Sequence, residues 1–283
     1  MAVNIIKINE LTQRYGNEKI ALNGINLEIK KGDFLAVIGQ NGAGKTTLVK
    51  HLIGLLRPES GSILINGRDT SEQSIAQLAQ KVGYVFQNPD HQLFLSSVEK
   101  EVAFGPGNLK LTPEEIGHRT ETAMEKVGIK HLRAESPLSL SKGQRQRVAL
   151  ASVLAMEPEI LILDEPTTGQ DYHEAIQIMD LVAALNHRGH TIIFITHDME
   201  LVALYAKRVI LMGKGEILAD GTPREVLSQD ALLAETHLKP PQITRLAQLL
   251  GNYNIPGDII SVDELLEVFR LKGHTIQESL EAV

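Results

Sequence analysis

The segment Gly39-Gln-Asn-Gly42-Ala-Gly44-Lys45-Thr46 constrains this chain of 283 residues more than any other. It follows the apolar run 34–38, which has the character of a strand buried on both faces, and it precedes a helical pattern over 46–56. A G-x-x-x-x-G-K-[ST] pattern between a strand and a helix is typical of a loop that cradles phosphate. A simple glycine turn has no need of Lys-Thr after its last glycine, so we favour phosphate binding.

Each residue type in this loop has a physical task. Glycines allow successive backbone N–H groups to point at phosphate oxygens, and the helix that begins near Lys45 adds the positive end of its dipole. The Lys45 ammonium supplies charge to the β- and γ-phosphates, and the Thr46 hydroxyl is a ligand for Mg²⁺. The predicted nucleotide contacts are Gly39, Gln40, Asn41, Gly42, Ala43, Gly44, Lys45, Thr46 and Thr47.

A second apolar run, 160–163, ends in two adjacent carboxylates, Asp164 and Glu165. The C-terminal edge of a parallel sheet is where α/β proteins bind ligands, so we expect this pair beside the Lys45 loop. Asp164 would hold Mg²⁺ through water, and Glu165 would polarise the attacking water. Alone, such a pair is more often a helix N-cap, and the Lys45 loop is what favours the catalytic interpretation.

The remaining patterns predict a mixed α/β chain with a parallel core. A helical segment over 174–185 lies between the apolar runs 160–163 and 191–195, as in a βαβ unit. The opening β-like runs indicate a small antiparallel layer, and the stretch that contains the capping box at Thr112 is mostly helical. The further expected strands are 5–9, 25–29, 62–65, 82–86, 209–212 and 216–219, and the helical stretch covers 98–156.

The prolines in Lys239-Pro240-Pro241 mark the best candidate boundary in the chain. Fewer than fifty residues follow them, which is short for an independent core. These residues predict two amphipathic helices. The first carries a stripe of Ile243, Leu246, Ala247, Leu249 and Leu250, and the second, capped at Ser261, carries Leu265, Leu266, Phe269 and Leu271.

Composition excludes several classes of protein. The chain has 28 Lys and Arg against 35 Asp and Glu, a formal net charge of −7 that argues against a protein whose task is to coat nucleic acid. It has no Cys, which excludes disulfides, cysteine-ligated zinc and thiol nucleophiles. No apolar run approaches the roughly 18 residues of a spanning helix, and the first ten residues lack a signal-peptide layout. We therefore expect any membrane work to depend on partners.

The segment Leu140-Ser141-Lys142-Gly143-Gln144 resembles the signature loop of ATP-binding-cassette (ABC) proteins, and the resemblance covers nearly all of 3–238. In its own right, Ser141 with Gln144 is a capping box at a helix start. The resemblance implies that Ser141, Gly143 and Gln144 contact the γ-phosphate of ATP bound to an opposite subunit, in a head-to-tail dimer with two ATP molecules. Lys142 stands where the family most often has glycine, and an exposed lysine is compatible with the cap.

The same resemblance implies a fold and a division of the chain. The fold is α/β of the P-loop NTPase class, with a RecA-like parallel sheet core and an N-terminal antiparallel β layer. We expect an ABC ATPase domain over 1–238, with a helical subdomain at about 91–156, and a helical C-terminal extension over 239–283. ATP and Mg²⁺ are the implied substrate and cofactor.

Four single positions also match the family. Tyr15 resembles the aromatic residue that stacks on adenine, although a tyrosine on a β-like segment is more often a core residue. Gln87 resembles the glutamine that senses Mg²⁺ and the transport partner. Asp171 resembles the aspartate that crosses the dimer, and its neighbour Gln170 stands where leucine is usual. His197 resembles the histidine that bonds the γ-phosphate, although a lone histidine after a strand is usually a turn residue.

The residues after Gln87 indicate which group within the ABC family this chain resembles. Gln87-Asn-Pro-Asp90-His91-Gln92-Leu-Phe94 and the segment 98–109 resemble the ATPases of energy-coupling-factor importers, including the cobalt and nickel group. In that group a pair of ATPases, copies or paralogues, works on the cytoplasmic face of the membrane. The pair drives a transmembrane coupling protein and a small substrate-binding membrane subunit, and imports vitamins or transition-metal ions.

Other interpretations stay open from the sequence. The chain also suits the ATPase subunit of another ABC importer or of an exporter. A nucleotide-switched assembly module without transport is a further alternative, although every hydrolysis position is occupied. The helices after Pro241 resemble the extension of the energy-coupling-factor group, where their apolar stripes serve either a dimer contact or core packing.

Overall fold

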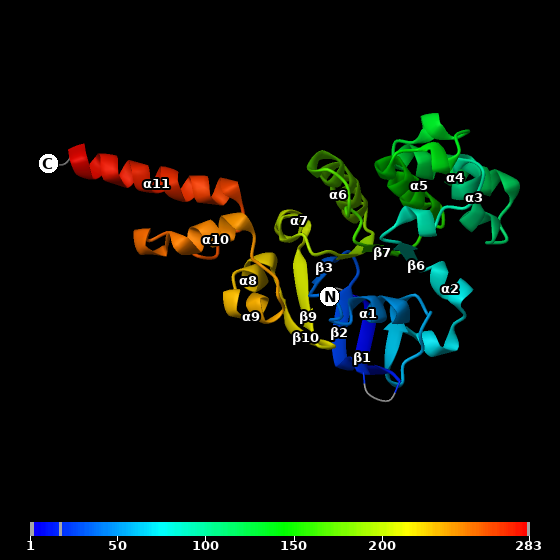
Figure 1. Ribbon diagram of the computed structural model, residues 1–283. Coiled ribbons are helices and arrows are strands. Elements are labelled where there is room, and N and C mark those ends of the chain that lie inside the picture. Colours follow the sequence, from blue (N-terminus) through cyan, green and yellow to red (C-terminus); the bar gives the residue numbers. More distant parts are fainter. Residues whose placement is uncertain (1–2, 17–18, 282–283) are drawn as a thin grey trace.

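The computed structural model describes residues 3–16 and 19–281. Within these ranges the strands form two sheets, and most helices gather around the larger one (Figure 1). The strands are β1 (Asn4–Tyr15), β2 (Lys19–Lys30), β3 (Phe34–Ile38), β4 (Ser60–Ile65), β5 (Arg68–Asp69), β6 (Val82–Val85), β7 (Ile160–Asp164), β8 (Thr191–Ile195), β9 (Arg208–Gly213) and β10 (Glu216–Gly221). The helices are α1 (Lys45–Leu52), α2 (Ile75–Ala79), α3 (Val98–Gly107), α4 (Pro113–Lys126), α5 (Lys142–Leu154), α6 (Tyr172–His187), α7 (Met199–Tyr205), α8 (Pro223–Leu227), α9 (Asp230–Glu235), α10 (Gln242–Leu249) and α11 (Val262–Glu281).

The larger sheet has the strand order β10-β9-β3-β8-β7-β6. Its strands from β9 to β6 run parallel, and β10 pairs antiparallel with β9 as the predicted hairpin. Every residue of β3 is buried because alternate side chains enter different cores: Phe34 and Ala36 face α5 and α6, while Leu35 and Val37 face α1 and the smaller sheet. The predicted parallel core is confirmed.

Strand order brings distant parts of the sequence to one edge of this sheet. Because β8 lies between β3 and β7, the C-terminal ends of these three strands are neighbours. The loop from Gly39 to Lys45 follows β3, the Asp164–Glu165 pair ends β7, and His197 follows β8. The parallel pairing therefore places the candidate functional residues together.

The smaller sheet is antiparallel, with the order β2-β1-β4-β5, as expected for the N-terminal layer. Its first two strands are longer than the predicted 5–9 and 25–29, because hairpin pairing continues through polar residues as far as Tyr15 opposite Lys19. α1 ends at Leu52 instead of reaching residue 56, since Gly54 adopts a left-handed backbone with φ of +75°. The short helices α2 and α7 were not predicted from the sequence.

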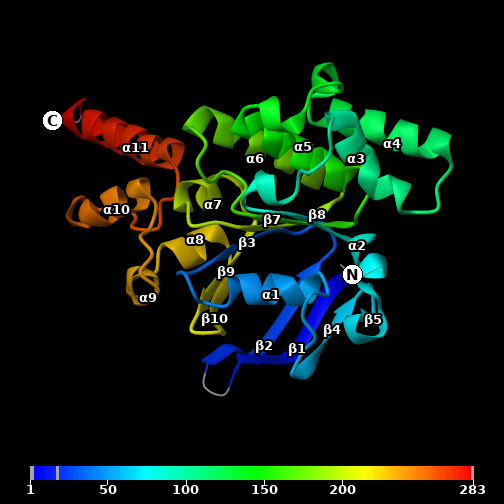
Figure 2. The ribbon, with the colours of Figure 1, turned by 45° about the vertical axis from the view of Figure 1, so that its right-hand side comes forward.

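Helices α3, α4 and α5 form the helical subdomain on one face of the larger sheet, opposite α1 (Figure 2). Their apolar side chains share one core with that sheet, including Val102, Met124 and Leu150. Ser141 caps α5 through the predicted capping box: its Oγ accepts from Gln144 N–H at 3.2 Å, and Ser141 N–H donates to Gln144 Oε1 at 2.9 Å. The sharp start of α5 thus fixes the loop before it.

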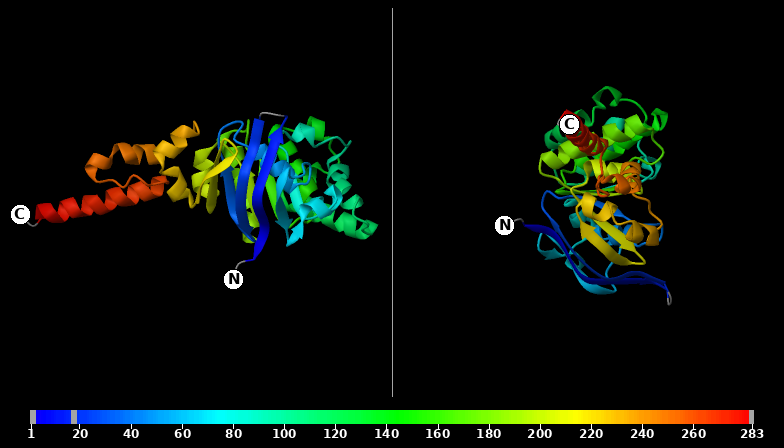
Figure 3. Two further views of the ribbon diagram at one scale, coloured as in Figure 1. Left: turned by 90° about the horizontal axis from the view of Figure 1, so that it is seen from below. Right: turned by 90° about the vertical axis from the view of Figure 1, so that its left-hand side faces the viewer.

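The last helices, α10 and α11, extend away from the rest of the molecule (Figure 3). They have a small core of their own, built from Ala247, Ile255, Ile259 and Leu265. The division between 238 and 239 stays a prediction, which this separate core supports. Among the described helices, none combines the length and the apolar character needed to cross a bilayer.

His51 on α1 carries a prediction about pH. Its ring is fully buried, Nδ1 donates to the Thr47 carbonyl at 2.8 Å, and Nε2 lies 3.1 Å from the Gln13 side chain. Burial lowers the pKa of His51 from its usual 6.5. As the pH falls through 6.5 the unfolded chain takes up the proton first, so stability is lost from pH 6.5 downward. We expect up to about 1.4 kcal/mol of this loss between pH 7.5 and 5.5.

Urea unfolding of the wild type and of His51→Gln at pH 7.5 and 5.5 measures this loss. The variant is expected to be less stable than the wild type at pH 7.5 and to lose less stability on acidification. Each protein serves as its own control at the higher pH. An equal acid-induced loss in the two proteins would contradict the assignment to His51.

Candidate functional site

A cleft of about 730 Å³ opens at the C-terminal ends of β3, β7 and β8. It gathers most of the residues that the sequence predicted for nucleotide and metal binding, from five separate segments of the chain. Its lining residues are Tyr15, Ala21, Gly39, Gln40, Asn41, Gly42, Gly44, Lys45, Thr46, Thr47, Gln87, Asp164, Glu165, Thr168, Ile195, His197, His237 and Leu238.

The loop between β3 and α1 needs its glycines. Gly39 and Gly44 have φ of +148° and +107°, and a Cβ on Gly44 would lie only 2.6 Å from the Ala21 carbonyl oxygen. Lys45 folds back over this loop, where Nζ donates to the carbonyl oxygens of Gly39 and, at 3.0 Å, of Gln40. These bonds hold the Lys45 ammonium beside the backbone at the start of the loop.

Burial and two nearby carboxylates act in opposite directions on the pKa of Lys45. Burial lowers the pKa of Lys45 from its ordinary value, while the carboxylates of Glu165 and Asp164 act in the opposite direction. The lysine is thus a partly desolvated cation that faces two acidic groups. Such a cation gains from an added anion, because less water screens their attraction.

Asp164 is held by a tyrosine that the sequence analysis missed. The Tyr84 hydroxyl, on the neighbouring strand β6, donates to Asp164 Oδ2 at 2.8 Å. Burial raises the pKa of Asp164, and the nearby Glu165 raises it further, against the effects of Tyr84 and Lys45. Burial also raises the pKa of the Tyr84 hydroxyl. The site therefore contains carboxylates that a bound cation would stabilise in their charged form.

The Glu165 carboxylate is fixed by three segments of the chain. Its Oε2 accepts from Gln87 Nε2 and from Thr168 Oγ1, each at 2.8 Å, and its Oε1 lies 3.3 Å from His197 Nδ1. The Glu165 side chain is only 17% exposed, whereas that of His197 is 65% exposed. The backbone of Glu165 is left-handed, with φ of +44°, and its N–H donates to the Ile195 carbonyl at 2.9 Å. This carboxylate is preorganised at the cleft.

Tyr15 also lies at the cleft, at the end of β1, and is 43% exposed. It is therefore not the core residue that its position on a β-like segment would favour when considered alone. An exposed ring on the wall of a cleft offers a flat face to a ligand.

The signature-like loop lies away from this cleft. Besides the cap at Ser141, Asp171 caps α6 by accepting from Glu174 N–H at 2.8 Å. Ala43 is buried behind the phosphate loop, where its carbonyl accepts from Gly215 N–H. The predicted contacts outside the cleft lining are Ala43, Ser141, Gly143, Gln144 and Asp171.

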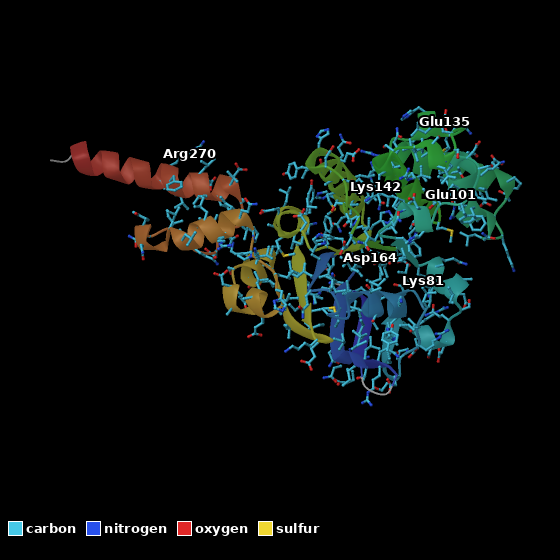
Figure 4. The ribbon with its side chains drawn as sticks, viewed as in Figure 1. Lys81, Glu101, Glu135, Lys142, Asp164 and Arg270 are labelled. Atoms are coloured by element: carbon cyan, nitrogen blue, oxygen red, sulfur yellow. The ribbon has the colours of Figure 1, made fainter. Side chains whose placement is uncertain are left out.

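Lys142 differs from the expectation of an exposed lysine. It is half-buried, and Nζ donates to the Thr168 carbonyl oxygen at 2.6 Å. Figure 4 labels Lys142 at the start of α5 and Asp164 at the end of β7. The lysine turns inward because the segment after β7, in which Gly169 has no side chain, leaves room for its ammonium.

Several lining residues had no signal in the sequence. Thr168 was not predicted, although its position three residues after Glu165 could have identified it. His237 and Leu238 reach the cleft from the end of α9, where Thr236 packs against Gly213 at the end of β9. No motif marks these two residues.

Sequence comparisons relate this chain to proteins of a known family. The sequence pattern of the ABC transporter family matches residues 22–168. An energy-coupling factor transporter ATP-binding protein of Clostridium novyi is 43% identical over 94% of this chain and 98% of its own length. A putative ABC transporter ATP-binding protein of Caldanaerobacter subterraneus is 46% identical over 93% of this chain, which spans only 45% of that relative's length.

Solved structures show the same fold. CbiO1 from Clostridium perfringens, described as part of the ABC transporter complex CbiONQ, is 40% identical with a TM-score of 0.76, over 88% of this chain and 99% of its own. A dimeric ATP-binding cassette in a post-hydrolysis state with ADP and Pi is 28% identical with a TM-score of 0.69, over 77% of this chain and 98% of its own. The chain therefore belongs to the ABC transporter family and has the fold of its ATP-binding cassettes.

Proposed function

We propose that this chain binds and hydrolyses ATP as the ATPase subunit of a membrane importer of the energy-coupling-factor type. One observation carries the ATPase proposal: the Lys45 loop, Asp164 and a carboxylate at Glu165 fixed by three segments converge in one cleft. The names of relatives such as the one from Clostridium novyi support the importer type.

The phosphates of ATP would lie on the loop from Gly39 to Thr47. Backbone N–H groups and the start of α1 favour an anion there, and Lys45 would exchange its bonds to loop carbonyls for bonds to phosphate oxygens. The exposed ring of Tyr15 would stack on the adenine. His197 would donate to the γ-phosphate from its exposed position.

The residues at the cleft fit Mg²⁺. Thr46, Gln87 and Asp164 offer oxygen atoms, which this small cation prefers, and Mg²⁺ usually takes few protein ligands beside phosphate and water. The raised pKa of Asp164 beside Glu165 fits the same interpretation, since a cation offsets their repulsion. When bound, Mg²⁺ neutralises charge on the β- and γ-phosphate oxygens.

Glu165 would act as the base that orients the attacking water. Its Oε2 already receives hydrogen bonds from Gln87 and Thr168, and its Oε1, which lies 3.3 Å from His197 Nδ1, has a second lone pair that can accept a hydrogen bond from water. The water then attacks the γ-phosphorus, and the bond to the β-phosphate oxygen breaks to give ADP and phosphate. The fixed carboxylate removes much of the entropy cost of aligning the water.

A second subunit, a copy or a paralogue, would complete each site. Ser141, Gly143, Gln144 and Asp171 lie outside the cleft of their own chain, so we assign them to the nucleotide of a partner. The dimeric cassette solved with ADP and Pi supports this assembly. ATP held between two subunits provides the difference in affinity between open and closed states that coupling to transport needs.

The remaining partners in this proposal are a transmembrane coupling protein and a small substrate-binding membrane subunit. The chain would work on the cytoplasmic face of the membrane, and the solute would be a transition-metal ion such as cobalt or nickel, or a vitamin. CbiO1, described as part of a complex, supports an assembly with further subunits. Other ABC importers or exporters, and a nucleotide-switched assembly module without transport, are the alternatives.

The surface beside Gln87 is suited to the coupling protein. Phe94 and Phe104 are exposed, and their rings pack edge to face at 5.1 Å. Next to β6, an apolar groove of about 290 Å³ is lined by Phe86 among other residues. Exposed aromatic side chains near a cleft commonly mark a binding surface. Gln87 contacts Glu165, so a partner bound here would lie close to the catalytic carboxylate.

Charge introduced on this surface tests the transport proposal. We expect the double variant Phe94→Asp with Phe104→Asp to bind ATP as the wild type does and to lose at least about tenfold in co-purifying membrane subunits, because the contact that desolvates these rings is removed. The measurement is tagged-chain purification from detergent-solubilised membranes, followed by identification of attached proteins and solute uptake in cells. Leu204→Asp, at an exposed apolar residue on α7, is the matched control. Equal recovery of membrane subunits with both variants would contradict this surface.

A further inference from the structure

One side chain connects the signature-like loop to the catalytic carboxylate of the same chain. Lys142, the first residue of α5, donates from Nζ to the Thr168 carbonyl oxygen at 2.6 Å. The hydroxyl of the same threonine donates to Glu165 Oε2 at 2.8 Å. A single residue therefore lies between the lysine and Glu165.

The segment that holds Thr168 is an irregular turn that receives a hydrogen bond from outside the segment. Glu165 and Gly169 both adopt left-handed backbone, with φ of +44° and +72°. Within the segment, the local turn bonds are long, at 3.2 Å from Thr168 N–H to the Glu165 carbonyl and from Gln170 N–H to that of Thr167. The Lys142 ammonium packs directly against Gly169, in space that any Cβ there would fill. A short, charge-assisted bond from a different subdomain thus fixes the turn at its centre.

We propose that Lys142 is a positioning residue for Glu165 and acts through Thr168. This inference rests on the proposed function. The lysine fixes the Thr168 backbone, which aims the hydroxyl at Oε2 and keeps the carboxylate oriented toward the water. Since Lys142 stands between Ser141 and Gly143, the same bond links the loop proposed to serve the partner's ATP to the catalytic residue of its own cleft.

Arg147 serves as the comparison that separates a positioning role of Lys142 from a purely structural one. Arg147, further along α5, donates from Nη2 to Gln177 Oε1 at 2.8 Å and so joins α5 to α6, the helix that follows the Thr168 turn. In the described part of the chain the Arg147 Nη1 also donates to the Val127 carbonyl oxygen at 3.1 Å. Neither bond reaches Thr168 or Glu165, so Arg147→Ala removes an anchor of α5 without changing the contacts of the catalytic carboxylate.

The test is steady-state ATP hydrolysis with a separate measurement of ATP binding. Lys142→Met keeps the aliphatic stem and removes the donor, and we expect its kcat to fall about tenfold, equivalent to about 1.4 kcal/mol, with KM and Kd within about twofold. Lys142→Arg, which restores a cationic donor, is expected to recover most of the kcat. Arg147→Ala is expected to keep kcat within about twofold of the wild type.

A double-variant cycle with Thr168→Val checks the route. If Lys142 acts through the threonine hydroxyl, the kcat of the double variant Lys142→Met with Thr168→Val is expected to lie within about twofold of the kcat of Thr168→Val alone. The proposal is overturned if Lys142→Met turns over ATP like the wild type, if Arg147→Ala loses as much, or if the two effects multiply. A wild-type chain without ATP hydrolysis would instead contradict the proposed function on which this inference rests.

Discussion

Glu165→Gln is expected to lower the kcat of ATP hydrolysis by about 10²- to 10⁴-fold, because a positioned general base contributes about that much. Glutamine has the shape of glutamate but cannot take a proton from water. The change also removes one of two adjacent carboxylates, and with it a repulsion that raises the pKa of Asp164. ATP affinity should therefore be kept or improved, and the closed dimer should persist with ATP bound.

Radiolabelled phosphate release, ATP binding and size-exclusion chromatography with and without ATP measure these effects. Glu159→Gln is the matched control, since Glu159 directly precedes β7, at the opposite end of the strand, where it accepts from Asn66 Nδ2 at 2.7 Å. The control is expected to hydrolyse ATP normally. Near-normal turnover by Glu165→Gln would remove Glu165 from the catalytic role.

Lys45→Ala should weaken ATP binding by about 10- to 100-fold, since charge-assisted hydrogen bonds contribute about 1.5–3 kcal/mol. The Lys45 ammonium lies over the loop, partly desolvated, with its donors directed at the carbonyl oxygens of Gly39 and Gln40. Alanine removes this cation and leaves the helix start and the backbone N–H groups in place. Hydrolysis is expected to fall at least as far as affinity, because the same charge stabilises the transferring phosphate.

Titration with a fluorescent ATP analogue measures the affinity, and a thermal melt without nucleotide checks that the fold is kept. Lys50→Ala is the control, because Lys50 is an exposed lysine on the same helix α1. A Kd for Lys45→Ala within twofold of that for Lys50→Ala would contradict phosphate binding by Lys45.

Local pattern was enough to predict the parts of the site that lie within one short segment. The glycine loop before Lys45 has one residue type for each backbone constraint, and the Asp164–Glu165 pair follows a wholly apolar strand. Such features are predictable because their causes, φ preference and strand burial, act between near neighbours in sequence. The parallel sheet then follows from the alternation of buried strands and helices.

Contacts between segments were not predictable in this way. Tyr84 reaches Asp164 only because β6 pairs with β7, and Lys142 reaches Thr168 only because α5 packs above the turn after β7. The β1–β2 hairpin extends beyond its apolar runs because backbone hydrogen bonds between the two strands also include the polar residues that follow. These contacts depend on strand register and on the packing of helices against the sheet, and neither can be inferred from the residues of one segment alone.

The strand order has a consequence for how the protein acquires its site during synthesis. The Lys45 loop leaves the ribosome early, but β3 and β7 do not pair with each other. They join one sheet only after β8, over Thr191–Ile195, has been made and pairs with both. A growing chain that stops before residue 191 therefore holds a phosphate loop without its catalytic edge. Nucleotide that binds the finished cleft stabilises the folded complete chain over its unfolded form by mass action, so this stabilisation begins only once the cleft is complete.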